Sequence, residues 1–270
     1  LVPGVSLLPH IDSVEDDTAA RYDEEAIYLN TPREVFARLS RIDLSFSADD
    51  TGFMTHDLHP YPAKFIPQIP GTLLSLLSAR GEVVFDPFGG SGTTALEAVR
   101  LGRRAISIDA NPLCALIGRA KTTAMVGVTI RELHALHAAL AAELPVLPKR
   151  PSELIARYRS HAPQITNREK WYSDTAFGEL CLIKARISEL ENLGSQDIAL
   201  VALSRIALRA SYQDSETRYK SVPRTVPRGE TLRRYLREFH AVFESLAMNS
   251  YATRYGMADF ITADVRALRQ

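Results

Sequence analysis

The sequence has 270 residues, of which 46% are apolar and 24% are charged. This length and composition suffice for one large hydrophobic core or two modest ones, and they exclude a disordered chain. Lys and Arg balance Asp and Glu at 32 each, which argues against a protein that binds nucleic acid through its whole surface.

Several broad classes can be set aside on local patterns. No run reaches the roughly 18 to 20 apolar residues of a membrane span, and the N-terminal LVPGVSLLPHIDSVEDD lacks the basic start of a signal peptide. Cys114 and Cys181 are too few for a disulfide framework, and neither lies in a CxxC or His-rich setting. We therefore expect a soluble cytoplasmic protein with no membrane contact and no metal site.

The first part of the chain is predicted to contain two helices. A short helix is expected near residues 31–39, where Thr31 and Pro32 supply an N-cap and a first-turn proline. Four prolines between residues 55 and 70 prevent a regular helix before the apolar run from 69 to 77, which is predicted to be the second.

A strand-turn-helix-strand unit follows. Residues 83–85 are predicted to form a short β-branched strand, 93–101 a helix closed by Gly102, and 105–108 a buried strand ending at Asp109. This order is the core of a parallel βαβ unit, so the fold class is predicted to be α/β.

Helical periodicity dominates from residue 113 to 251, and is clearest in ELHALHAALAAEL and DIALVALSRIALRAS. A proline-rich break at 144–151 and a polar, basic loop at 212–228 interrupt it. Residues 218–237 carry seven Lys or Arg against one Glu, whereas residues 12–25 are acidic. Residues 258–268 are predicted to form a third strand ending at Asp264.

The glycine-rich turn at residues 86–94 has three candidate ligands. A phosphate loop of the GxxxxGK type needs a Lys that is absent here. A dinucleotide site fits better, because Gly90, Gly92 and Ala95 match GxGxx(G/A), and Asp109 follows about twenty residues later, where a ribose-binding carboxylate belongs. S-adenosylmethionine requires the same turn and the same acid.

Charge separates the last two ligands. A pyrophosphate binds backbone N–H groups at a helix N-terminus, and the carboxylate of Asp86 at the start of this turn would repel it. S-adenosylmethionine has no phosphate and carries an ammonium and a sulfonium, which a carboxylate attracts. The turn therefore favours the methyl donor over NAD.

These residues also carry a family resemblance. DPFGGSGTT, residues 86–94, resembles the DPFxGSGTT signature of the amino-methylating DNA methyltransferases and matches every fixed position. HPYPAKFIP, residues 59–67, resembles the segment which those enzymes wrap around the methionine end of the donor, and QDSETRY, residues 213–219, is similar to a further patch in bacterial members.

The resemblance implies a Rossmann-like S-adenosylmethionine-dependent methyltransferase fold, and it implies roles for individual residues. Asp86 faces the methionine ammonium, Asp109 takes the ribose hydroxyls, and Asp264 meets the adenine amino group. Lys64 or His59 meets the donor carboxylate. The residues that shape the turn around the donor are Phe88, Gly90, Gly92 and Thr93.

Strand-end capping of a helix is the alternative role for Asp109 and Asp264, and plain surface is the alternative for Lys64.

One expected part of the family is missing. Its members hold the target amine of cytosine N4 or adenine N6 in a (D/N/S)PP(Y/F/W) loop, and the sequence contains no Pro-Pro pair. Three predicted strands also supply only half a sheet, leaving strand 1 as an edge. We therefore expect the donor-binding half of a restriction-modification DNA methyltransferase, inactive alone, and either truncated or completed by a second polypeptide.

The predicted organisation has three parts: a polar lead-in (1–54), a donor-binding half-domain (55–125 with 256–270), and a helical insertion (126–255) that reaches double-stranded DNA. The first candidates for phosphate contact are Arg218, Lys220, Arg224 and Arg228. Two other functions stay open: a methyltransferase acting on RNA, protein or a small molecule, and a non-catalytic donor-binding subunit.

Overall fold

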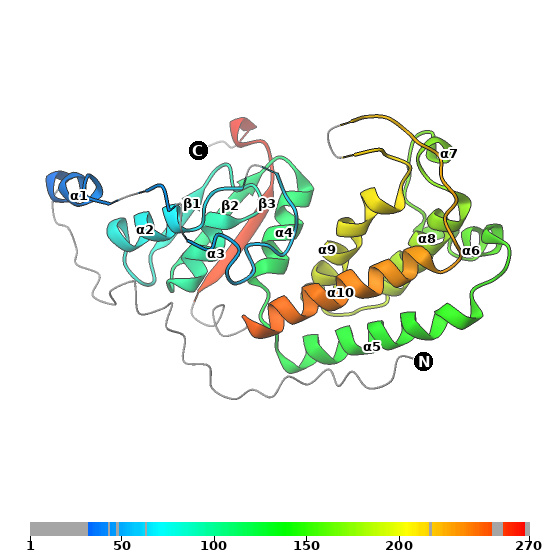
Figure 1. Cartoon of the computed structure of the whole chain (residues 1–270). Coiled ribbons are helices and arrows are strands. Elements are labelled where there is room, and N and C mark those ends of the chain that lie inside the picture. The colour runs from blue at the N-terminus through cyan, green and yellow to red at the C-terminus, as the bar shows by residue number, and fades with distance from the viewer. Residues whose placement is uncertain are drawn as a thin grey trace.

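A three-stranded parallel sheet forms the centre of one part of the molecule, in a computed structural model that describes residues 32–42, 44–46, 49–62, 64–215, 218–249 and 256–267. The strands are β1 (Val83–Asp86), β2 (Arg104–Asp109) and β3 (Met257–Thr262), and β2 lies between the other two. Asp86 pairs with Ser107, and Asp109 pairs with Thr262. The predicted α/β class and the three parallel strands are confirmed (Figure 1).

The helices of the predicted βαβ unit also form. They are α2 (Gln68–Leu77), α3 (Thr93–Arg100) and α4 (Pro112–Thr122), preceded by α1 (Pro32–Leu39). Thr31, the expected N-cap of α1, lies outside the described residues. The third strand ends earlier than predicted, and Asp264 lies two residues beyond it. Its carboxylate accepts a hydrogen bond from the Arg266 N–H, 3.0 Å away, in a turn that leads into a 3-10 helix, Val265–Ala267.

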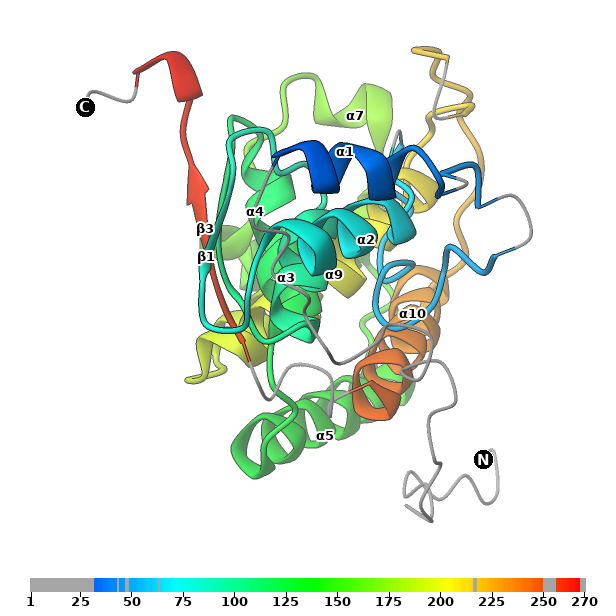
Figure 2. The same ribbon diagram turned by 90° about the vertical axis from the view of Figure 1, so that its left-hand side faces the viewer.

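One face of the sheet is covered and the other is open. Ala95, Ala98 and Ala105 form a small core with Leu74 and Phe260, and Figure 2 shows α2, α3 and α4 on one side of the edge-on strands. On the opposite face, four apolar side chains are 43–67% exposed: Val83, Phe85, Met257 and Ile261. The register places them on a common surface because side chains alternate along a strand.

The helical part holds most of the hydrophobic core. Its helices are α5 (Gly127–Glu143), α6 (Pro151–Arg157), α7 (Arg168–Trp171), α8 (Asp174–Ser188), α9 (Leu193–Ala210) and α10 (Glu230–Met248). The predicted helical periodicity from residue 113 is therefore confirmed in the described part of that range. Ile117 and Ala120 of α4 belong to the same core as Ile198 of α9 and Tyr235 of α10, so α4 connects the sheet to the helices.

The two predicted interruptions have local structure of their own. The proline-rich break contains a 3-10 turn, Leu144–Val146, and ends where Pro151 opens α6. In the basic loop after α9, Gln213 and Ser221 form an antiparallel bridge, so that segments 212–215 and 218–222 run side by side; we call these two segments the arm.

The described residues contain no single helix that is long and apolar enough to cross a membrane. One pair, Pro112–Thr122 with Gly127–Val146, passes that test jointly, by length and composition, and is bent by 115°.

Candidate functional site

The glycine-rich turn leaves β1 at Asp86 and crosses the end of β2. Asp86 Oδ1 accepts a hydrogen bond from the Phe88 N–H at 3.0 Å, and the Gly89 N–H donates to the Ile108 carbonyl at 2.9 Å. A Cβ on Gly89 would lie 1.8 Å from Ser107 Oγ. Gly89 is therefore required for packing on β2, whereas the Phe88 side chain is 75% exposed.

The other two glycines of the turn differ in their surroundings. Gly92 is the N-cap of α3 with φ +79°, and a Cβ there would lie 3.0 Å from the Gly118 Cα. Gly90 has φ +50°, and a Cβ there would meet nothing within 4 Å. Both conformations favour glycine. The backbone at Gly90 is thus the open part of the turn, and Thr93 begins α3 just beyond it, 5% exposed.

Asp109 ends β2 beside that open backbone. Its Oδ2 accepts a hydrogen bond from the Gly90 N–H at 3.0 Å, and its Oδ1 accepts one from the Asn111 N–H at 2.8 Å. The carboxylate is partly exposed, and each oxygen keeps a further lone pair for a ligand hydroxyl. Asp109 therefore fixes the turn and remains able to accept more hydrogen bonds.

The end of β3 lies next to Asp109. The Ala263 N–H donates to the Asp109 carbonyl at 3.1 Å, so Asp264 follows at the same edge of the sheet. The Asp264 carboxylate is exposed and paired with the Arg266 guanidinium, which lowers the pKa of Asp264. The structure thus brings Asp86, Asp109 and Asp264 to the carboxyl ends of three neighbouring strands.

The proline-rich segment 55–67 packs against the same region. The Cys114 Sγ and the Tyr61 Oη lie 3.1 Å apart and share a hydrogen bond at the start of α4. This hydrogen bond is the main cause that raises the pKa of Tyr61, and the nearby Asp109 carboxylate raises it further. Tyr61 therefore places the segment within reach of the Asp109 charge.

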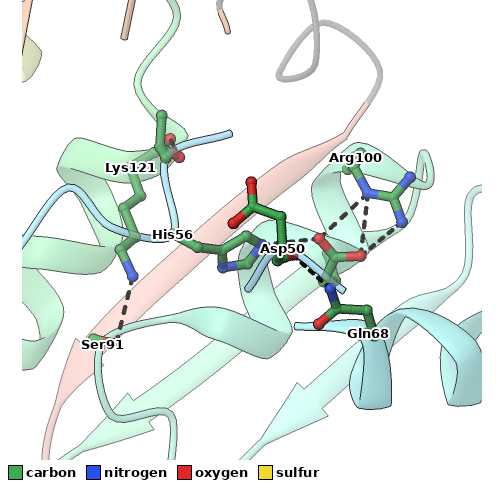
Figure 3. A network of polar contacts seen from close by, with 8 residues as sticks. Asp50, His56, Gln68, Ser91, Arg100 and Lys121 are labelled. Atoms are coloured by element: carbon green, nitrogen blue, oxygen red, sulfur yellow. Dashed lines mark hydrogen bonds and ion pairs between the residues drawn. The ribbon is translucent and has the colours of Figure 1, made fainter. Parts of the chain in front are cut away.

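A buried polar network lies beneath the turn (Figure 3). His56 Nε2 lies 2.9 Å from Glu97 Oε1, and Arg100 donates to the same carboxylate at 2.7 Å. Burial alone would raise the pKa of Glu97, but the His56 hydrogen bond and the Arg100 charge outweigh it and lower that pKa. Burial lowers the pKa of His56, so at neutral pH the pair consists of a carboxylate and a neutral imidazole.

Lys121 is the second buried charge of this region. Its side chain is fully buried, and its ammonium donates to the Ser91 hydroxyl of the turn at 3.4 Å, the one hydrogen bond that the described structure gives it (Figure 3). Burial, together with the nearby Lys64 charge, lowers the pKa of Lys121 to about 7. An ammonium has three donors, so this one keeps most of its hydrogen-bonding capacity.

The two residues predicted to bind the donor carboxylate, Lys64 and His59, both form hydrogen bonds with other residues of the chain. Lys64 donates to the His56 carbonyl at 3.1 Å and to the Asp57 carboxylate at 2.6 Å. His59 is 7% exposed, and its Nε2 lies 2.8 Å from Ser204 Oγ. Their predicted contact with a ligand stays a prediction.

The four candidates for phosphate contact fall into two pairs. Arg224 donates to the Arg209 and Ser211 carbonyls, and Arg228 donates to the Leu147 carbonyl at 2.8 Å. Arg218 and Lys220 lie on the arm and are exposed. All four side chains are exposed, and the first pair also bonds to neighbouring backbone carbonyls.

The sequence analysis missed Ser91, Glu97, Lys121 and His56. Glu97 and Lys121 stand in helical patterns where a charged residue normally faces water, and tertiary packing, of segment 55–67 and for Glu97 also of α2 at Gly71, buries them. The sequence signal that could have indicated this network was the content of His and Pro in segment 55–67, which precedes the turn.

Known proteins match parts of the chain. A family model described as DNA methylase matches residues 28–117. The type II methyltransferase M.MjaII of Methanocaldococcus jannaschii is 41% identical over 66 residues, 24% of this chain and 12% of that protein. M.MvaI of Kocuria varians is 30% identical over 150 residues, 54% of this chain and 32% of that protein.

M2.DpnII of Streptococcus pneumoniae is 42% identical over 64 residues, 22% of this chain and 24% of that protein. The matches therefore span at most 32% of the length of these three relatives. No solved structure matches the chain. The turn, the acid at the end of β2 and the proline-rich segment all lie within residues 28–117, the part of the chain that matches the DNA methylase family model.

Proposed function

We propose that this chain is the donor-binding part of an S-adenosylmethionine-dependent DNA methyltransferase that acts on the exocyclic amino group of cytosine or adenine. One observation carries the proposal. The open backbone at Gly90 lies beside the partly exposed carboxylate of Asp109, within the segment that matches the family. The relatives named as type II methyltransferases support a place in a restriction-modification system.

The residues at the strand ends fit S-adenosylmethionine in their chemistry. A side chain at Gly90 would occupy the space that a ligand needs, and glycine leaves it free. The carboxylates of Asp86 and Asp109 suit a ligand that carries positive charge and ribose hydroxyls, and would repel a pyrophosphate. The bound donor would supply the methyl group for transfer to the target amine.

Each residue of the site has a proposed role in binding. Asp109 accepts the ribose hydroxyls, Asp86 attracts the methionine ammonium, and Asp264 accepts from the adenine amino group. Phe88, Gly90, Gly92 and Thr93 shape the turn, and Lys64 and His59 remain candidates for the donor carboxylate.

To these we add Lys121. Its ammonium touches Ser91 of the turn, so we propose that it attracts the carboxylate of the donor from beneath.

The three strands and their helices are proposed to be strands 1–3 of the Rossmann-like methyltransferase fold, with residues 126–255 inserted. The open face that carries Val83, Phe85, Met257 and Ile261 supports further chain packing there. We propose that the covering part, on the same or a second polypeptide, also supplies the loop that holds the target amine, because residues 1–270 contain no Pro-Pro pair. The isolated 270 residues are then expected to transfer no methyl groups to DNA.

The proposal is tested by calorimetric titration of the chain with S-adenosylmethionine, with its demethylated product, and with NAD. We expect either methyl-donor compound to bind more tightly than NAD. Asp109→Asn should weaken binding by about tenfold or more, since a lost charge-assisted hydrogen bond costs about 1.5–3 kcal/mol.

Asp259→Asn is the matched control for that titration. Its carboxylate is 49% exposed on the neighbouring strand, where it pairs with Arg104. Donor affinity should stay unchanged in this variant. Tighter binding of NAD, or equal losses in both variants, would overturn the proposed donor site.

A further inference from the structure

The arm has a defined backbone near its base. The Asp214 N–H donates to the Lys220 carbonyl at 2.9 Å, and the Val222 N–H donates to the Tyr212 carbonyl at 2.7 Å. Together with the bridge between Gln213 and Ser221, these bonds fix which side chains the segments 212–215 and 218–222 present. Figure 1 shows the arm extending beyond the end of α9.

Tyr219 is the most exposed large hydrophobic side chain of the described residues, at 83%. One side of its ring is backed by Trp171 of α7, with ring centroids 4.7 Å apart and planes tilted by 51°. The Tyr212 N–H donates to the Trp171 carbonyl at 2.7 Å, and Ser221 Oγ donates to the Lys170 carbonyl. The tyrosine ring is therefore supported from behind, and most of its surface faces solvent.

Positively charged residues lie close to this pair of rings in the structure or in the sequence. Arg218 and Lys220 flank Tyr219 in the sequence, and both are exposed. The Arg218 guanidinium, 74% exposed, has an ion pair at 3.7 Å with Asp214. Lys170 places its ammonium 5.1 Å from the centre of the Trp171 ring. Among the described residues, one cation thus lies over Trp171 and two lie next to Tyr219 in the sequence, with Asp214 paired to Arg218.

This combination fits one ligand chemistry. Exposed single apolar residues are common on protein surfaces and alone indicate nothing. A supported aromatic ring between cations is different, because nucleobases stack on aromatic faces while Lys and Arg hold the phosphates on either side. A paired base inside a duplex has both faces covered by its neighbours, so only an unstacked base offers a free face to such a ring.

We infer that Tyr219, backed by Trp171, is a stacking platform for an unstacked DNA base, and that Arg218 and Lys220 contact the phosphates beside that base. The inference rests on the proposed action on DNA and goes beyond it, since it assigns a contact outside the donor site. It also differs from the grip on the target amine, which the resemblance assigns to a (D/N/S)PP(Y/F/W) loop.

The single tryptophan of the chain makes the platform directly observable. Emission from Trp171 reports any base that stacks on the rings. The 270-residue chain is mixed with two labelled duplexes of the same sequence, one fully paired and one with a single base opposite an abasic position. Fluorescence anisotropy of the label gives the affinity, and Trp171 emission gives the contact.

We expect wild-type protein to bind the duplex with the unpaired base more tightly, with a change in Trp171 emission. Tyr219→Ala should weaken binding to that duplex by about 5- to 150-fold, since stacking contributes about 1–3 kcal/mol per base, and should leave the fully paired duplex nearly unaffected. Tyr219→Phe keeps the ring and is the matched control, so it should bind like wild type.

Three results would overturn the inference. The first is that Tyr219→Ala and wild type bind both duplexes with equal affinity, and the second is that Tyr219→Phe loses as much affinity as Tyr219→Ala. The third is that Trp171 emission does not change when the duplex with the unpaired base binds. A fourth contrary result is measured by sedimentation. If Tyr219→Ala changes the self-association of the protein and leaves its DNA affinity intact, the Tyr219 ring contacts protein and not DNA. Retained binding of DNA and donor in any of these cases would leave the proposed function standing. Donor binding without any DNA binding would overturn the DNA assignment as well.

Discussion

His59 Nε2 lies 2.8 Å from Ser204 Oγ, a contact that joins the proline-rich segment to α9 across 145 residues of sequence. Burial lowers the pKa of His59 to about 4, and the positive charges of Arg205, Lys121 and Lys64 act in the same direction. His59 Nδ1 is buried and has no hydrogen-bond partner among the residues that the structure describes. The imidazole is therefore neutral at pH 7, and its protonation would introduce a charge among cations.

This contact predicts a loss of stability in mild acid. The unfolded chain binds a proton at His59 near pH 6.5, whereas the folded chain does so only near pH 4, so the stabilisation is present above pH 6.5 and is lost as the pH falls toward 4. Between pH 7 and 5.5, His59 should lower the free energy of unfolding by about 1 kcal/mol.

Urea unfolding at a series of pH values measures this effect. His59→Gln should flatten the pH dependence relative to wild type, while Ser204→Ala, which keeps the titrating ring, should retain it. Equal slopes for wild type and His59→Gln would show that His59 does not titrate with folding.

Local sequence signals located the strands and helices well, because each depends on neighbouring residues. The βαβ unit and its turn could be read from β-branched runs, Gly102 and the two strand-end acids. The network beneath the turn could not. Glu97 and Lys121 are buried because segments far away in sequence, His56 with its neighbours and α2, pack over α3 and α4. The extent of β3 was also overestimated, since the carboxylate of Asp264 favours a turn.

Gly118 of α4 is predicted to be essential for packing on the sheet. A Cβ there would lie 2.2 Å from Phe260 Cε1, which belongs to a ring held between α4 and Gly92. Gly118→Ala should therefore lower the free energy of unfolding by about 1–3 kcal/mol, the usual cost of overpacking. Urea denaturation gives the value.

Two further variants test the cause. Phe260→Leu in the Gly118→Ala background should recover part of the loss, giving a coupling energy of about 0.5 kcal/mol or more. Gly127→Ala is the matched control, since its Cβ would approach only the flexible end of Arg131, at 3.3 Å. If the losses of Gly118→Ala and Phe260→Leu simply add, the steric explanation is wrong.

Two consecutive arginines are predicted to differ in their contribution to stability. Arg103 is 5% exposed, and its guanidinium donates to the Ser78 and Leu74 carbonyls at the end of α2. Arg103→Met would remove the donor to the Ser78 carbonyl and one of the donors to the Leu74 carbonyl, and should cost about 2–3 kcal/mol. Arg104 forms an ion pair with Asp259 in which both side chains are about half exposed, so Arg104→Met should cost less than about 1 kcal/mol.

The urea concentrations at the unfolding midpoints of Arg103→Met and Arg104→Met measure this difference in stability. Arg103→Lys should recover little of the loss, since an ammonium cannot reproduce the fork of a guanidinium. Similar midpoints for Arg103→Met and Arg104→Met would contradict the assigned helix-end role.

The four candidate DNA-contacting cations are predicted to separate into two functional pairs. Arg218 and Lys220 are exposed on the arm, whereas Arg224 and Arg228 donate to backbone carbonyls of Ser211 and Leu147. Replacing the first pair with Ala should weaken DNA binding for all sequences and reduce the salt slope by about two counterions, without a change in unfolding free energy. Replacing the second pair should lower stability by about 1–3 kcal/mol, because each guanidinium satisfies carbonyls that would lose their donor. Salt titrations of DNA binding, with urea unfolding of the same proteins, measure both effects.

A larger change in salt slope for the Arg224 and Arg228 variant than for the Arg218 and Lys220 variant would contradict this prediction. The cations of the segment after the arm, and not those of the arm, would then contact the phosphates.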